Sequence, residues 1–171
     1  MTPHLHIARG DDFESPKLSA RLPSPLSGIA SAEWSNFVNA LVTQGLGDVS
    51  ASNGLGWFEM RPRRLADLGL MSNLRRVNNK ANRQVYEGDF VLPLTMRKFL
   101  ENPVIQYNTL VKSVIDHFDT HVNELKLPDD VSKSGALAIL HKAGPGGLKT
   151  WSTGKRFDDT VSLFNRANGI F

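Results

Sequence analysis

The stretch of sequence that decides the fold is residues 54–70, GLGWFEMRPRRLADLGL. Its first part is a glycine followed by two aromatic residues and Glu59. Pro62 then stands where it can open a short helix, because proline fits the first turn of a helix. Gly69 ends this helix after Leu68, since glycine readily adopts the left-handed conformation of a C-cap. The stretch therefore predicts an aromatic element followed by a short helix.

An apolar helical stripe precedes this stretch. Its members recur at the i, i+3, i+4, i+7 and i+8 spacing of one helix face, and they are Trp34, Phe37, Val38, Leu41 and Val42. We therefore expect a core helix from Ser31 to about Gln44. The glycine-, serine- and asparagine-rich residues 45–56, GLGDVSASNGLG, then predict a loop with a short hairpin.

The remainder of the chain is predicted to be mostly helical. Residues 73–83 are polar and basic and predict a protruding loop or irregular hairpin that leads into an extended segment, residues 86–92. Helical spacing and capping residues then predict four helices. They are residues 95–101, a long helix from Pro103 whose apolar stripe reaches Leu125, residues 132–144, and a last helix that begins near Asp158. The expected fold class is mainly α with one small β excursion.

Residues 1–30 form a different kind of segment. They contain four prolines and several serines without a helical or alternating apolar period, so we interpret them as an extended arm or linker before a domain of residues 31–171. Apolar residues such as Leu5, Phe13 and Leu22 are too numerous for a purely solvated tail. We expect the arm to pack along the domain or against a partner subunit.

Composition limits the classes of function. The 171 residues allow one domain, or one domain with a tail, and their net charge is +3. The chain has no cysteine, which excludes disulfides, thiolate metal sites and a cysteine nucleophile. The sequence contains no run of about 18 apolar residues, the length that a membrane span needs, so no span is predicted. Residues 1–20 lack the apolar region of a secretory signal.

The pattern around residues 54–70 resembles the core of the lysozyme-like superfamily, in particular lytic transglycosylases and phage or secretion-system muramidases. The matching positions are Gly56, Trp57, Phe58, Glu59, Pro62, Leu65, Leu68 and Gly69. Residues 102–106, residues 135–147 (GALAILHKAGPGG) and the ending LFNRANGIF fit more loosely. The resemblance implies a lysozyme-like helical domain and a peptidoglycan-directed protein that cleaves glycan strands as a muramidase or lytic transglycosylase. It implies no metal and no cofactor.

The catalytic acid is the point at which the chain departs from the family pattern. In the family, the helix before the loop ends in a glutamate that protonates the glycosidic oxygen. Here that place falls near Gln44, whose amide cannot act as a general acid. Glu59 is the replacement candidate, because its neighbours Phe58 and Met60 could desolvate the carboxyl. The alternative is that Glu59 forms a structural ion pair with an arginine of the basic segment that follows it.

The resemblance also assigns the substrate contacts. The residues expected to contact glycan are Gln44, Asn53, Trp57, Gln106, Tyr107 and His141. For His141, orienting a carboxylate and packing against the turn at residues 144–147 are the alternatives. Asp48 is either the second carboxylate of an inverting arrangement or an N-cap or turn residue.

Three other patterns carry less specific signals. His117 and His121 have the i, i+4 spacing that lets two imidazoles reach one metal, but no third ligand is evident, so we expect partly buried helix histidines. Residues 142–147, KAGPGG, lack the ending of a phosphate loop and predict a helix C-cap and turn. Seven basic residues fall within residues 61–83, with Asp67 as the only acid. They would contact nucleic-acid phosphates or cell-wall carboxylates, or form a solvated basic face. Because no nucleic-acid motif accompanies them, nucleic acid is not the expected partner.

Two functions stay open on these observations. The first is glycan-strand cleavage by a component of a phage or phage-derived injection particle that acts in the periplasm or cell wall, since no signal peptide is seen. The second is a catalytically inactive structural or tail-assembly protein on the same fold, which binds the cell wall or, through residues 1–30, partner subunits. The absence of a glutamate at Gln44 and the apolar arm favour the second.

Overall fold

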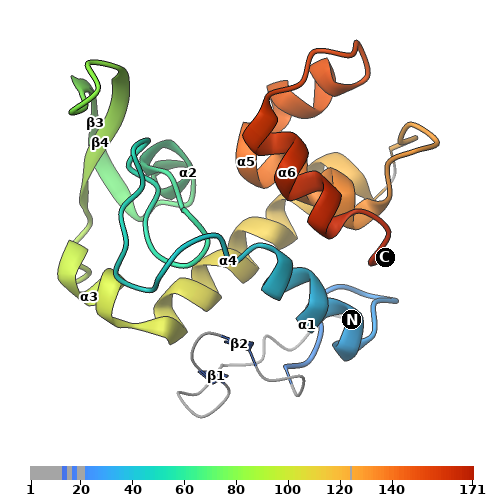
Figure 1. Cartoon of the computed structure of the whole chain (residues 1–171). Helices are drawn as coiled ribbons and strands as arrows, with labels where there is room; N and C mark the ends of the chain where they lie inside the picture. The colour runs from blue at the N-terminus through green and yellow to red at the C-terminus, as the bar shows by residue number, and fades with distance from the viewer. Residues whose placement is uncertain (1–12, 15–16, 19–21, 124) are drawn as a thin grey trace. The chain divides into compact units, whose positions relative to one another are not determined.

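The computed structural model describes the backbone of residues 13–14 and 17–18, and the backbone and side chains of residues 22–123 and 125–171. Over these residues the chain is mainly helical, with short antiparallel pairs of strands (Figure 1). It divides into two compact units. Unit 1 contains the described residues up to Leu41 together with Ser113–Phe171, and unit 2 contains Val42–Lys112. The larger part of the expected arm lies outside the described residues.

The described part of the arm has structure of its own. Strands β1 (Phe13–Glu14) and β2 (Lys17–Leu18) pair in antiparallel orientation. Leu22 and Leu26 follow, and both side chains are buried in unit 1. Burial removes their apolar surface from water, which stabilises the packing of this segment.

Helix α1 (Ser31–Ala40) buries the predicted stripe, and Trp34, Phe37 and Val38 are fully shielded from solvent. The helix ends at Ala40, so the prediction that it continues to about Gln44 was wrong. The reason is that the residues after Leu41 form hydrogen bonds with the following loop instead of continuing the helix.

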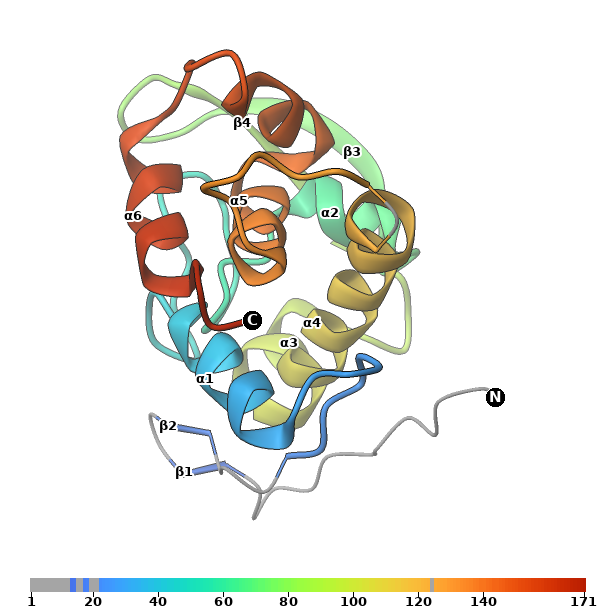
Figure 2. The same ribbon diagram turned by 90° about the vertical axis from the view of Figure 1, so that its right-hand side faces the viewer.

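Helices α5 (Lys133–Trp151) and α6 (Asp158–Ala167) lie side by side in unit 1 (Figure 2). Both helices begin at the predicted places, and the Ser132 hydroxyl caps α5 by accepting a hydrogen bond from the backbone N–H of Gly135. The prediction that Gly144 ends this helix was only partly right. Gly144 has a left-handed φ of 69° and kinks the chain, but Pro145 fits the first turn of a new helical segment that continues to Trp151.

In unit 2, α2 (Pro62–Asp67) begins at its proline and is followed by Gly69 with a φ of 77°, as predicted. The segment expected to be a loop or irregular hairpin is a long hairpin of β3 (Met71–Asn78) and β4 (Gln84–Phe90), with a bulge that begins at Ser72. Helix α2 packs against both strands near the base of the hairpin (Figure 1). The irregular-hairpin alternative is therefore confirmed, and the mostly polar strand residues lack the apolar alternation that would have excluded a loop.

Helix α3 (Met96–Glu101) begins after its predicted cap, Thr95. Helix α4 (Pro103–His117) continues into a π-helical turn, η2 (Phe118–Val122). Leu125 lies beyond this turn and is 57% exposed, so its inclusion in the apolar stripe was wrong. The π-helical turn has more residues per turn than an α-helix, which shifts the phase of the stripe and ends it.

Candidate functional site

The loop after α1 is organised by the amide of Gln44. Its Nε2 donates hydrogen bonds to the backbone carbonyl oxygens of Asp48, Gly54 and Gly56, at 3.1, 2.9 and 2.9 Å. An ionised glutamate here would face three carbonyl oxygens with an acceptor-only group. Gln44, which we expected to contact substrate, therefore uses its amide donors to hold the loop together.

Asp48 closes the first turn of the same loop. Its Oδ2 accepts the backbone N–H of Gly45 at 2.7 Å, and its own N–H donates to the carbonyl oxygen of Gly45 at 3.2 Å. This reciprocal pair is the geometry of a turn residue, so it favours the turn interpretation over a second catalytic carboxylate.

Glu59 lies in a tight turn between Leu55 and Met60, whose backbones exchange hydrogen bonds of 3.0 and 3.1 Å. Its φ is 47°, which is a strained conformation for a residue other than glycine. Gly54 makes room for this turn, because a Cβ at Gly54 would lie 2.9 Å from the Glu59 Cβ. The Glu59 side chain is half-buried, and its Oε1 accepts a hydrogen bond from the Thr43 hydroxyl at 2.7 Å.

Buried aromatic and apolar side chains flank Glu59 in the sequence. Phe58 and Met60 are each 1% exposed, as the bracketing pattern led us to expect. Trp57, which we expected in a glycan groove, is 5% exposed, and its ring packs edge to face on Phe58 with centroids 6.2 Å apart. Glu59 itself is only half-buried between these buried neighbours, and its hydrogen bond with Thr43 is exposed to solvent.

Gln106 and Tyr107 have roles in the core of unit 2 instead of in a groove. Gln106 is 1% exposed and Tyr107 is 2% exposed. The Gln106 Oε1 accepts the backbone N–H of Trp57 at 2.9 Å, and its Nε2 donates to the carbonyl oxygens of Leu46 and Phe99 at 2.8 and 2.9 Å. The amide thus satisfies backbone groups that would otherwise be buried without partners.

Asn53 joins the loop to the β3–β4 hairpin. It has a left-handed φ of 58°, and its Nδ2 donates to the carbonyl oxygen of Tyr86 at 2.9 Å. A cavity of about 490 Å³ lies at this junction, lined by residues 49–51 and 53 of the loop and by hairpin residues including Val77, Lys80 and Glu87. Asn53 is the only residue of the expected substrate set that lines this cavity.

His117, His121 and His141 lie in unit 1. His141 is half-buried in α5. His117 is 3% exposed, and its ring centroid is 6.2 Å from that of His121. Within the described ranges, no group of three or more histidine, cysteine, aspartate or glutamate side chains is arranged to hold a metal ion.

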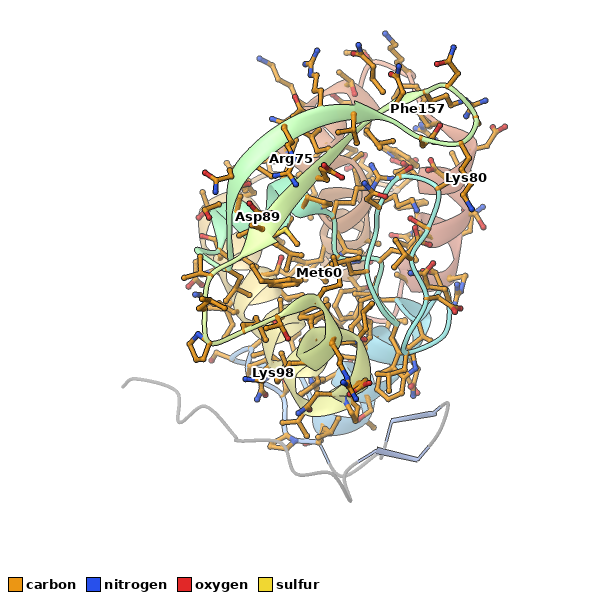
Figure 3. The ribbon with its side chains drawn as sticks, turned by 90° about the vertical axis from the view of Figure 1, so that its left-hand side faces the viewer. Met60, Arg75, Lys80, Asp89, Lys98 and Phe157 are labelled. Atoms are coloured by element: carbon orange, nitrogen blue, oxygen red, sulfur yellow. The ribbon has the colours of Figure 1, made fainter. Side chains whose placement is uncertain are left out.

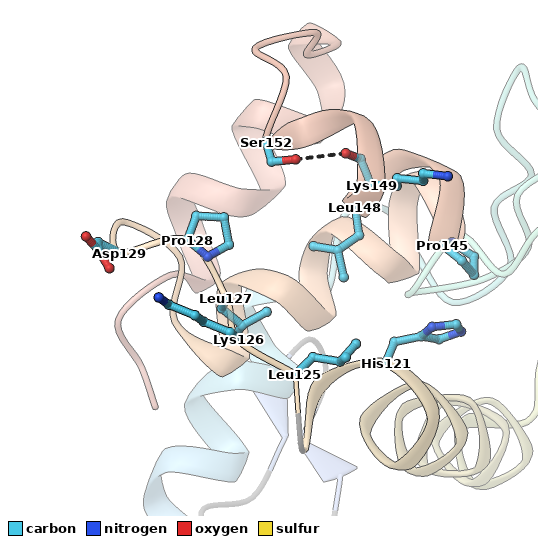
Figure 4. A pocket seen from close by; sticks show the side chains of 10 residues that line it. All are labelled: His121, Leu125, Lys126, Leu127, Pro128, Asp129, Pro145, Leu148, Lys149 and Ser152. Atoms are coloured by element: carbon cyan, nitrogen blue, oxygen red, sulfur yellow. Dashed lines mark hydrogen bonds between the residues drawn. The ribbon is translucent and has the colours of Figure 1, made fainter.

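Unit 1 also has a groove of about 690 Å³ that the sequence did not predict (Figure 4). Its lining residues are His121, Leu125, Lys126, Leu127, Pro128, Asp129, Pro145, Leu148, Lys149 and Ser152. Its apolar residues Leu125 and Leu127 are separated by Lys126 and followed by Asp129 and Asp130, so the sequence contains no apolar run that would have predicted the groove. Glu59 lines neither this groove nor the cavity of unit 2.

The charges of the hairpin are partly paired (Figure 3). The Arg75 Nε lies 2.7 Å from the Glu87 Oε1, and the Arg75 Nη2 lies 3.3 Å from the Asp89 Oδ1. Hydrogen bonds to these carboxylates raise the pKa of Arg75. Hydrogen bonds from Asn73 and then from Arg75 lower the pKa of Asp89. The sequence of residues 61–83 does not reveal this pairing, because Glu87 and Asp89 lie on the neighbouring strand β4.

No family model, curated protein or solved structure matches this chain. Of the helices in the described part of the chain, none is long and apolar enough to cross a membrane. The geometry of the chain's own residues is therefore the basis for assigning a function.

Proposed function

We propose that this chain is a lysozyme-like, peptidoglycan-directed protein that cleaves glycan strands, with Glu59 as the acid that protonates the glycosidic oxygen. The observation that carries this proposal is the 2.7 Å hydrogen bond between the Glu59 carboxyl and the Thr43 hydroxyl. Thr43 directly precedes Gln44, the position at which the family pattern has its catalytic glutamate. The Glu59 carboxyl, which comes from a later segment of the chain, is thus hydrogen-bonded to the residue that precedes Gln44, the position that lacks a carboxyl.

The surroundings of Glu59 support the same role. The left-handed backbone at Glu59 is a strained conformation, and such strain is concentrated at functional sites. Buried Phe58 and Met60 on either side hold the turn, so the carboxyl has a defined orientation. A positioned acid of this kind accelerates proton transfer by roughly 100-fold to 10,000-fold.

The proposed reaction needs one carboxyl, that of Glu59, which first donates a proton and later takes one back. The Glu59 proton moves to the bridging oxygen while the bond between that oxygen and the anomeric carbon breaks. The carbon is then attacked by water, or by a hydroxyl of the same sugar, and the attacking oxygen loses its proton to the Glu59 carboxylate. The proposed setting is a phage or phage-derived particle that delivers the chain to the cell wall, and the reaction uses no metal or cofactor.

The test is the release of soluble muropeptides from purified peptidoglycan by wild-type protein and by Glu59→Gln. We expect the variant to lose activity by about 100-fold or more with little change in melting temperature. Glu101→Gln is the matched control, because Glu101 forms an exposed pair with Arg97. Equal release by Glu59→Gln and wild type, or no release by folded wild-type protein, would overturn the proposal.

A non-cleaving protein on the same fold is the second candidate. The Gln44 geometry favours it, because the loop is held by an amide that donates to three carbonyl oxygens and cannot supply a proton. Such a protein would bind the cell wall or, through its first 30 residues, partner subunits. Co-sedimentation with peptidoglycan without muropeptide release would support this candidate.

A further inference from the structure

Four cations on α2 and the β3–β4 hairpin differ from the paired Arg75. Arg63, Arg76, Lys80 and Arg83 are all exposed. Arg75 is neutralised by two carboxylates, but none of these four has a carboxylate within ion-pair distance among the described residues. Lys80 lies at the turn of the hairpin, at the opposite end from Asp89 (Figure 3). The hairpin therefore carries positive charge that the described part of the chain does not neutralise.

Two of these cations are gathered around one aromatic ring. The guanidinium carbons of Arg63 and Arg76 lie 5.2 and 5.4 Å from the centroid of the Tyr86 ring. The Arg76 Nε also donates to the Tyr86 hydroxyl at 3.0 Å. Two like charges at one ring repel each other, and the attraction of each to the ring offsets this only in part. An anion bound beside them would relieve the repulsion.

Unpaired amides lie between the cations. Asn78, Asn82 and Gln84 are exposed, and their side chains have no hydrogen-bond partner among the described residues. Asn79 differs from them, because its side chain holds the turn through hydrogen bonds to Ala51, Ala81 and Arg83. The exposed amides are available to donate and accept hydrogen bonds with a partner.

The register of the hairpin brings these groups to one face. Arg76 is paired with Tyr86, and Asn78 is paired with Gln84, so all four project from the same side of the two-stranded ribbon. The intervening pair, Val77 with Val85, projects from the other side and lines the cavity beside the loop, and Asn78 and Lys80, close to the turn, border the same cavity. One face of the ribbon thus carries cations and amides, with Arg63 of α2 beside Tyr86 and with Asn78 at the border of the cavity.

We propose that the cationic face of the β3–β4 hairpin binds double-stranded nucleic acid. A two-stranded antiparallel ribbon fits the major groove of B-form DNA. The unpaired cations would contact phosphates, which supply affinity, and the amides between them would reach base edges. An anionic wall polysaccharide requires the cations alone, whereas the exposed amides beside the cations also match the hydrogen-bonding groups of base edges. This activity is independent of Glu59 and goes beyond the proposed glycan cleavage.

The experiment measures binding of the full chain to a fluorescent DNA duplex of about 20 base pairs by anisotropy, between about 50 and 200 mM salt. The logarithm of the association constant falls with the logarithm of salt with a slope of about −0.9 for each neutralised phosphate. We expect a slope of about −3 to −4 for wild type. Combining Arg63→Gln, Arg76→Gln, Lys80→Gln and Arg83→Gln should bring the slope close to zero. Arg97→Gln is the control, because Arg97 is an exposed arginine already paired with Glu101.

The outcomes separate the alternatives. Absence of salt-dependent binding by wild type, or an unchanged slope in the quadruple variant with a native circular dichroism spectrum, would overturn the proposal. Tighter binding to a purified anionic wall polysaccharide than to the duplex would also overturn it and identify the wall polymer as the partner. Arg76→Lys keeps the charge and should retain the slope. Glu59→Gln should bind DNA as wild type does, so failure of the cleavage proposal does not affect this result.

Discussion

The side chain of Gln106 accepts the backbone N–H of Trp57 at 2.9 Å, across 49 positions of sequence, in a place where both residues are buried. The same side chain donates to two further carbonyl oxygens, so one amide connects three segments of unit 2. This connection holds the backbone that leads into the Glu59 turn.

Replacing this amide with an apolar side chain of similar size should destabilise the protein. We expect Gln106→Met to lower the free energy of unfolding by about 2 to 5 kcal/mol, because it leaves a buried N–H and two carbonyl oxygens without partners. Urea unfolding followed by tryptophan fluorescence measures the change. Gln84→Met, at an exposed position of β4, is the control. Equal unfolding midpoints for the two variants would contradict the structural role of Gln106.

Placing a glutamate at Gln44, where the lysozyme-like pattern has one, should not create a catalytic acid. In Gln44→Glu, an ionised carboxylate would face the carbonyl oxygens of Asp48, Gly54 and Gly56. We expect the variant to be nearly as stable as wild type near pH 4, where the carboxyl is protonated, and clearly less stable at pH 7. Thermal unfolding at both pH values tests this, with Gln84→Glu as the exposed control. Higher muropeptide release by Gln44→Glu would contradict it.

A methyl group at Gly54 should disturb the Glu59 turn. The added Cβ would lie 2.8 Å from the Ser50 Oγ and 2.9 Å from the Glu59 Cβ, closer than atoms can pack. We expect Gly54→Ala to destabilise the protein by about 1 to 3 kcal/mol and to reduce muropeptide release. Gly146→Ala is the matched control, because it meets no atom within 4 Å in α5. That change should stabilise the helix by about 0.5 to 1 kcal/mol, and an equal loss in both variants would count against the turn argument.

The carboxyl of Asp89 should titrate below its ordinary pKa of 3.8, because Asn73 and Arg75 donate hydrogen bonds to its ionised form. Since the pKa is lowered in the folded state, this interaction stabilises the hairpin above the ordinary value and is lost as the pH falls through the lowered one. NMR titration of the carboxyl carbon measures the midpoint. Asn73→Gly removes the amide but tolerates the left-handed φ of 53°, and it should raise the midpoint. An unchanged midpoint would assign the shift to Arg75 alone.

Much of the local structure followed from short sequence signals. Helix α2 begins at Pro62 and is followed by Gly69. Thr95 caps α3 and Ser132 caps α5. Gly169, with a φ of 83°, follows the last helix. These features depend on the backbone hydrogen bonds of a few adjacent residues, so the sequence reports them directly. The buried neighbours of Glu59, Phe58 and Met60, were also predicted from the sequence, because both side chains are large and apolar.

The sequence by itself determined the helix boundaries that depend on caps, the apolar stripe of α1 and the concentration of basic residues around the hairpin. Only the tertiary structure decided that Gln44 and Gln106 hold backbone groups and that Thr43 binds Glu59. It also decided which hairpin cations are neutralised. The physical reason is that most of these contacts join residues between 10 and 60 positions apart in the sequence. A side-chain amide or guanidinium has the same local sequence pattern whether its partner is a distant backbone carbonyl, a carboxylate on a neighbouring strand or a ligand.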